Sequence, residues 1–237
     1  MEHAMNVQGS AALGVLAFLG TSALLAACAV SWVMLRMRKN RAAARWIARS
    51  AGLVAGGYAA ALGLFSLASR STDLAPGEAK YFCEIDCHLA YSVAGAEALA
   101  APATASDAAG VTREVVRLKV WFDPSTISPH RGDSPLWPNP RAVSLVGSDG
   151  RTYAPSERGM QAYRSDHPDS PTLEQPLRPG EAYTASVVFD LPRGVTGTRL
   201  VLTESDPVTR VLIGHENSPF HGKAGFLLPV PAAGSRS

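Results

Sequence analysis

Two long apolar runs come first along the chain, and short alternating runs follow them. Residues 11–35 are predominantly apolar and uncharged, and this run is longer than the roughly 20 residues that a helix needs to cross a membrane. Residues 50–69 form a second, shorter run that is rich in Gly and Ala. The pattern predicts one transmembrane helix over 11–35, another over 50–69, and a short exterior N-terminus over 1–10.

The segment between the two runs, 36–49, is strongly basic and holds no acidic residue. Short loops rich in Lys and Arg stay on the cytoplasmic side of a membrane. We therefore expect 36–49 to be a cytoplasmic loop in a bacterial plasma membrane. The N-terminus and everything after the linker 70–80 would then lie on the periplasmic or exterior side. Trp32 and Trp46 flank the basic segment, as residues of an aromatic belt do.

From residue 81 to 237 the pattern becomes that of half-buried strands. In 111–123, Val116, Leu118, Val120 and Phe122 fall on one face, while charged residues fall on the other. The long segments 94–110 and 128–141 are expected to be loops. Seven or eight short strands of this kind predict a β-sandwich. The further strands are expected around residues 88–98, on both sides of a turn in 142–155, and at 181–192, 198–205, 208–214 and 224–230.

Two short motifs in this region have a recognisable form. Asp149, Gly150 and Tyr153 make a D-G-x-x-Y hairpin, and a P-G-E turn at 179–181 leads into a strand ending V-F-D-x-P at 188–192. With these motifs, residues 111–205 resemble a bacterial family of extracellular immunoglobulin-like domains, often membrane-anchored and mostly of unknown function. The resemblance implies an all-β immunoglobulin-like sandwich. With the apolar runs, the fold expected is a two-helix transmembrane hairpin followed by this sandwich, and both the two-helix anchor and the cysteine motif depart from the family's simplest form. The family has no common catalytic residues, so the resemblance implies no enzymatic activity.

The charge distribution narrows the class of partner. The chain carries 22 basic and 20 acidic residues, but six of the basic ones fall between Arg36 and Arg49. The remainder is therefore mildly acidic, which argues against nucleic acid. We expect the membrane lipid bilayer and a membrane or envelope protein as partners.

The stretch "YFCEIDCHLAY", residues 81–91, holds the best candidate for chemistry. Cys83 and Cys87 are followed directly by His88. Two lone cysteines on an oxidising side usually form a disulfide. In a straight strand their Cα atoms would lie about 13 Å apart, whereas a disulfide needs less than about 7 Å. A bridge therefore requires a turn at 84–86.

The same three residues leave other interpretations open. Two thiolates and an imidazole are good ligands for copper, so a thiol-redox or copper-binding protein is the alternative function. Haem is disfavoured because the spacing has one residue more than C-x-x-C-H. No other cofactor is expected. A straight strand would hold two buried thiols and point His88 to the opposite face.

The remaining candidates are weaker. Trp137, in the Pro-rich loop, would either anchor a partner or cap the core. Gly52 and Gly56 share a small-residue face that would pack on the first helix or on a partner. His167, His215 and His221 are metal-capable loop residues without a fixed ligand spacing. Cys28 ends a lipobox-like "LAAC" and is either lipidated or an inert thiol. We expect no catalytic residues, and hence a non-enzymatic interaction or accessory module of a larger membrane complex.

Overall fold

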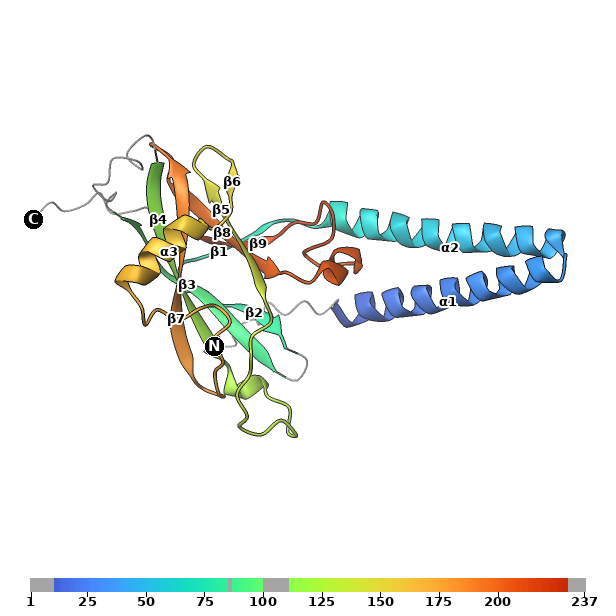
Figure 1. The fold of residues 1–237 in the computed structure, drawn as a ribbon, viewed down its shortest axis with the longest axis horizontal. Helices are drawn as coiled ribbons and strands as arrows, with labels where there is room; N and C mark the ends of the chain where they lie inside the picture. The colour runs from blue at the N-terminus through green and yellow to red at the C-terminus, as the bar shows by residue number, and fades with distance from the viewer. Residues whose placement is uncertain (1–10, 85–86, 100–110, 230–237) are drawn as a thin grey trace, which may run out of the picture. The chain divides into compact units, whose positions relative to one another are not determined.

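The computed structural model describes three stretches of the chain, residues 11–84, 87–99 and 111–229. Predictions for residues 1–10, for 85–86 in the expected turn and for 100–110 in the expected loop lie outside them. The chain divides into two compact units (Figure 1). The helical unit combines Gln8–Ser71 with Asp206–Lys223, and the β unit contains Thr72–Ser205 and the strand that follows Lys223.

The helical unit is built around two apolar helices, α1 (Ala11–Met37) and α2 (Arg41–Ala68). Only Arg38, Lys39 and Asn40 separate them, and Lys39 has a φ of 59°. The Asn40 side chain caps α2 by accepting a hydrogen bond from the Ala43 amide at 3.1 Å. Most of the basic segment 36–49 is therefore helical rather than loop, because this cap and the Ala-rich sequence after it favour a helix.

The two helices pack along one stripe of partly buried residues spaced three and four apart, the pattern of a left-handed helical pair. Gly52 and Gly56 lie outside this stripe, and no atom lies within 4 Å of where their Cβ atoms would be. The expected contact of Gly52 and Gly56 with the first helix is thus not formed, and the helices meet through other residues. The stripe consists of Gly14, Phe18, Thr21, Leu25, Cys28, Ser31 and Leu35 on α1, and Ala44, Ile47, Ala51, Val54, Tyr58 and Ala61 on α2.

The β unit holds two sheets, so the chain is two apolar helices followed by a mostly β domain. All neighbouring strands of the first sheet are antiparallel. In the second sheet β1 and β9 pair in parallel, and the other neighbours are antiparallel. The first sheet has the order β2 (Lys80–Cys83), β3 (His88–Leu99), β4 (Val111–Phe122), β7 (Ala182–Pro192). The second has the order β1 (Thr72–Leu74), β9 (Ala224–Leu227), β8 (Gly197–Glu204), β5 (Arg141–Gly147), β6 (Thr152–Tyr153).

Several elements differ from the sequence prediction. The loop expected at 94–110 is wrong over its first residues, because β3 continues to Leu99. The strand expected at 208–214 is wrong, because Pro207–Val211 forms a 3-10 helix, η2, whose first turn is capped by the Asp206 side chain. A second 3-10 turn, η1 (Pro124–Thr126), follows β4. The unpredicted helix α3 (Glu157–Asp166) covers the edge of β7. There the Val188 amide lies 3.2 Å from Met160 Sδ, so this strand edge is not left open.

The motifs that carry the family resemblance have a structural role. The Tyr153 hydroxyl donates to Asp149 Oδ2 at 2.7 Å, and Gly150 adopts a φ of 76° in the turn between them. Hydrogen bonds from the Tyr153 hydroxyl and the Arg151 amide lower the pKa of Asp149, and the bond from Tyr153 is the largest cause. Gly180 likewise has a φ of 83° in the turn before β7. Such residues fix turns and carry no chemistry.

One apolar core lies between the two sheets and draws on both. Val116, Leu118, Val120 and Phe122 of β4 are fully buried, which confirms the alternation read from the sequence. Lys119, between them, is exposed. The second sheet contributes Leu145, Leu200, Leu202 and Phe226 to the same core.

Replacing a central core residue is expected to destabilise the β unit strongly. Leu118→Ala removes a fully buried side chain from β4 and should lower the free energy of unfolding by about 2–5 kcal/mol. The matched control Lys119→Ala changes the exposed neighbour on the same strand and should cost within about 0.5 kcal/mol. Urea unfolding, followed by labelling of the buried Cys87 thiol, measures both. Equal losses for the two variants would contradict the assignment of the core.

Candidate functional site

The stretch around the cysteine pair is a hairpin. Cys83, at the end of β2, pairs with His88, the first residue of β3. The Glu84 amide donates to the Cys87 carbonyl at 2.8 Å. The chain therefore turns between Glu84 and Cys87, and the straight-strand alternative is excluded.

The predicted disulfide between Cys83 and Cys87 is not present. The reason is that the two side chains occupy different environments. Cys83 follows the buried Phe82, so strand alternation directs its thiol to the surface, and it is exposed. Cys87 is buried in the apolar core, with its Sγ 3.9 Å from the Glu84 carbonyl oxygen.

The turn places Cys83 and His88 across from one another but separates both from the Cys87 thiol. Among the described residues, no three His, Cys, Asp or Glu side chains form a group that could hold a metal ion. Copper binding and thiol-redox chemistry stay predictions.

A buried ion pair at this turn was not anticipated from the sequence. Glu84 accepts hydrogen bonds from Arg141 and Asn139. The side chains of Glu84 and Arg141 are only 2% and 1% exposed. Because Glu84 follows β2 and Arg141 begins β5, the pair joins the two sheets. No local signal reveals it, since 57 positions separate the partners along the chain.

Aromatic rings surround the Arg141 guanidinium. Its carbon lies 4.3 Å from the ring centre of Phe82 and 5.6 Å from that of Tyr91. The two rings meet edge to face, with centres 5.3 Å apart. Burial raises the pKa of Tyr91 to about 12. Burial also raises the pKa of Glu84, and this effect outweighs the lowering by the Arg141 charge.

The Pro-rich loop 128–141 is held at both ends by the cysteine turn. Just before the loop, Thr126 Oγ1 accepts a hydrogen bond from the His88 amide at 3.0 Å. At its other end, Asn139 donates to Glu84. Between these ties, Leu136 pairs with Leu177, and Trp137 next to it is 71% exposed. Trp137 therefore does not cap the core. We call Cys83, His88 and Trp137, with the turn and loop that carry them, the hairpin–loop surface.

The other predicted site residues lie elsewhere. His167 stacks on Tyr163 at the end of α3, with ring centres 4.2 Å apart. His215 and His221 belong to the helical unit, where His215 is buried and His221 Nδ1 lies 2.6 Å from the Gly222 carbonyl oxygen. Cys28 lies on the α1 stripe. Within the described residues, none of these four forms a metal-binding group with Cys83, Cys87 or His88.

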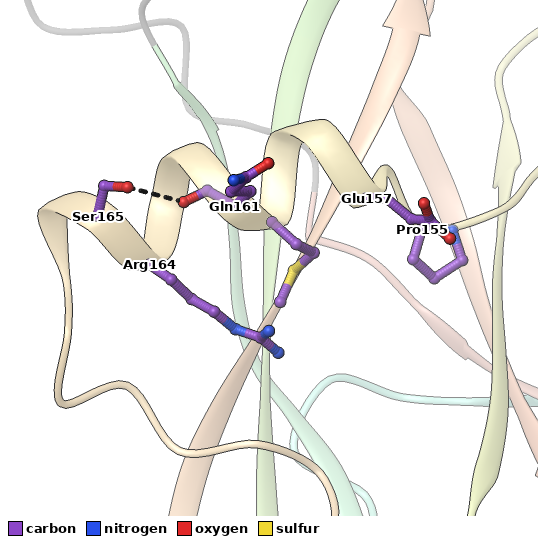
Figure 2. A pocket seen from close by; sticks show the side chains of 6 residues that line it. Pro155, Glu157, Gln161, Arg164 and Ser165 are labelled. Atoms are coloured by element: carbon purple, nitrogen blue, oxygen red, sulfur yellow. Dashed lines mark hydrogen bonds between the residues drawn. The ribbon is translucent and has the colours of Figure 1, made fainter.

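A pocket on α3 is the second surface feature that sequence reasoning missed (Figure 2). The signal for α3 was present: Ser156 caps its first turn, Glu157 begins it and Arg164 lies in its last turn. In Figure 2, Arg164 reaches away from the helix at one end of the pocket and Glu157 lies at the other. The pocket has a volume of about 540 Å³ and is lined by Pro155, Glu157, Met160, Gln161, Arg164 and Ser165.

Comparison with known proteins gives distant likenesses. No family model matches the chain, so the resemblance to the immunoglobulin-like family is not confirmed, and no curated protein matches either. The secreted protein MPT63 from Mycobacterium tuberculosis is 12% identical, with 68% of this chain and 99% of that one covered and a TM-score of 0.41.

Two further solved structures are similar at the same level. A conserved hypothetical protein from Bacillus anthracis is 14% identical, over 52% of this chain and 85% of that one, with a TM-score of 0.34. The yjhA protein from Bacillus subtilis is also 14% identical, over 65% and 98%, with a TM-score of 0.35. Likenesses this distant assign neither a family nor a function to the chain.

Breaking the buried ion pair is expected to destabilise the β unit in a pH-dependent way. Arg141→Met keeps the side-chain volume but leaves the Glu84 carboxylate buried without its cation, which should cost about 3–5 kcal/mol near pH 7. Adding Glu84→Gln should recover part of the loss. The exposed pair Arg117–Glu97 is the control, since Arg117→Met should cost less than about 1 kcal/mol.

The sign of the pH dependence follows from the raised pKa of Glu84. Folding favours its protonated form, so this contribution to stability is full below the ordinary value and is lost as pH rises through the raised one. Without Arg141 the pKa rises further, so the destabilisation should be small near pH 4 and grow towards about pH 7. Urea unfolding across this range measures it. A pH-independent cost would show that lost packing, not the charge, is responsible.

Proposed function

We propose that the chain is a non-enzymatic, membrane-anchored interaction module of the bacterial plasma membrane. In this proposal α1 and α2 form a transmembrane hairpin, and the β unit is an immunoglobulin-like sandwich on the periplasmic or exterior side. The hairpin–loop surface would contact a membrane or envelope protein, as the surface of an accessory subunit in a larger complex.

The exposed apolar surface of α1 and α2 supports the membrane anchor. Both helices are long and apolar enough to span a bilayer, and in each the most apolar 18-residue window is only 6% buried. A helix that is apolar all round needs cover from lipid or protein. The narrow stripe between α1 and α2 leaves most of each helix surface uncovered.

The basic residues at the connection support the orientation. The Arg36 guanidinium carbon lies 5.5 Å from the Trp32 ring centre, and that of Arg49 lies 5.7 Å from the Trp46 ring centre. Arg and Trp side chains stacked in this way suit a membrane interface, where the ring sits at head-group level and the charge reaches water. The excess of basic residues there favours the cytoplasmic side.

Trp137 is the observation that carries the interaction role. Exposed tryptophans are frequent anchors at protein interfaces because one side chain buries a large area on binding. Its loop is tied to the cysteine turn near both ends, so little conformational freedom remains to be lost on binding. The immunoglobulin-like assignment is supported by two mainly antiparallel sheets that share one core.

Thiol labelling in spheroplasts tests the anchor and its orientation. A membrane-impermeant maleimide should label the exposed Cys83 without prior reduction, since it is a free thiol. Lys39→Cys in a Cys83→Ser background should be labelled only after the membrane is permeabilised. The reverse pattern would overturn the orientation. Labelling of both positions before permeabilisation would overturn the membrane anchor.

Photo-crosslinking at Trp137 tests the interaction role. A photoreactive phenylalanine at position 137 should give a specific protein adduct in intact cells, whereas the same residue at the exposed Arg151 should not. Trp137→Ala should weaken binding of that partner by about 2 kcal/mol or more, the size of a hot-spot loss. The unfolding free energy of the Trp137→Ala variant should be unchanged. Equal adducts at both positions, or unchanged affinity, would contradict the proposal.

A further inference from the structure

The segment Asp206–Lys223 of the helical unit partly reverses the distribution of polar and apolar side chains that a water-soluble loop shows. Three of its apolar residues, Val208, Val211 and Phe220, are between 40% and 82% exposed, whereas Leu212 is buried. Its polar residues Thr209, His215, Glu216 and Ser218 are all less than 8% exposed. Loops in water normally show the opposite distribution.

Several polar groups of this segment are hydrogen-bonded within it. Asn217 Nδ2 donates to Thr209 Oγ1 at 2.8 Å, and Ser218 Oγ donates to the Leu212 carbonyl at 2.6 Å. The Asn217 amide donates to His215 Nδ1 at 3.1 Å. Backbone bonds close successive turns through the amides of Thr209, Leu212, His215, Ser218 and His221. Internal pairing of this kind is what an apolar solvent requires.

Three contacts attach the segment to the outer part of the helix pair (Figure 1). The Tyr58 hydroxyl donates to the Val211 carbonyl at 2.6 Å. A Cβ on Gly14 would collide with the Ile213 carbonyl oxygen, so the chain approaches α1 closely there. The Gly222 amide donates to Ser69 Oγ at 2.7 Å.

The positions of these contacts give the depth of the segment. Tyr58 precedes the end of α2 at Ala68 by ten residues, about 15 Å along a helix. Tyr58 and Gly14 both lie inside the apolar runs expected to cross the membrane. The segment therefore does not stop at the helix ends but runs back beside the spans.

Phe220 shows the reversal most strongly. It is 82% exposed, and its φ of 65° lies in the left-handed region that an aromatic residue rarely adopts. A strained backbone persists only where the surroundings compensate for it. Among the described residues, none covers most of this ring, so a large apolar surface is left for an apolar surrounding to cover.

We propose that Asp206–Lys223 is an interfacial membrane element. It lies beside α1 and α2 in the outer leaflet, with Val208, Val211 and Phe220 among the lipid acyl chains and its polar side chains turned inward. This inference rests on the proposed membrane hairpin. It adds that the chain returns to the bilayer between β8 and β9, so that the lipid surface itself is a ligand of this segment.

Acyl chains fit this face better than water does. Exposed apolar side chains gain free energy on transfer into hydrocarbon, at about 25 cal/mol per Å² buried. The exposed Arg210 lies between Val208 and Val211, and its long side chain suits a head-group phosphate. An interfacial segment with apolar side chains inserted and a basic one at the surface is a known mode of monotopic binding.

Spin-label accessibility on the full chain in phosphatidylcholine–phosphatidylglycerol vesicles tests the inference. A nitroxide is attached at Phe220→Cys in a Cys28→Ala, Cys83→Ser background. The same background with Phe220 retained corrects for any reaction at the buried Cys87. Val30→Cys, exposed on α1, is the lipid reference, and Ala162→Cys, exposed on α3, is the aqueous one. Relaxation by oxygen and by a water-soluble nickel complex reports depth.

The ratio of oxygen to nickel accessibility at position 220 is expected to approach that at position 30 and to exceed that at position 162 several-fold. If position 220 matches position 162 while position 30 is lipid-exposed, the inference is wrong and the membrane hairpin stands. If position 30 is itself water-exposed, the membrane hairpin fails. If neither reagent reaches position 220, protein covers this face instead of lipid, and the inference is overturned.

Discussion

The ion pair between Glu84 and Arg141 is the contact on which the arrangement of the β unit depends. It links the turn after β2 to the start of β5, and so connects one sheet to the other. The same contact also positions the hairpin–loop surface. Glu84 opens the turn that separates the Cys83 and Cys87 thiols, and Arg141 closes the loop that carries Trp137. A buried pair of this kind gives little net stability against an apolar alternative, but leaving one partner unpaired is costly. Its effect is therefore to specify one geometry.

The parts of the fold that the sequence predicted are those decided by local periodicity. The alternation in β4 places Val116, Leu118, Val120 and Phe122 in the core without reference to any distant residue. The apolar lengths of α1 and α2 are equally local. The segment 208–214 failed because its Val, Thr and Leu favour a strand, whereas the Asp206 cap and Pro207 favour a tight helical turn. The course of the cysteine turn was beyond local pattern because its determinant, Arg141, lies far along the chain.

The candidate surfaces were predictable to a different degree. Trp137 is recognisable from its Pro-rich surroundings, but its exposure depends on the ties made by Thr126 and Asn139, which no spacing rule indicates. The burial of polar residues in Asp206–Lys223 is also a property of the fold. In sequence, His215, Glu216 and His221 read as solvated loop residues. Only the contacts with Tyr58, Gly14 and Ser69 show that this segment is built against apolar helices.

Three buried charged residues, two in the first sheet and one in the turn after β2, reach the second sheet. Lys80 of β2 donates to the Leu202 carbonyl of β8 at 2.6 Å. Glu114 of β4 accepts from the Gly197 amide at 2.8 Å, and burial raises its pKa. Glu84 pairs with Arg141. Apolar packing is non-directional, so a core of Val, Leu and Phe alone tolerates several offsets between sheets. Polar contacts at three places penalise every offset but one, because each shift would leave a charge buried without its partner. Together they fix how the two sheets lie on each other, and the contacts of Glu84 hold the turn and the end of the loop that carries Trp137.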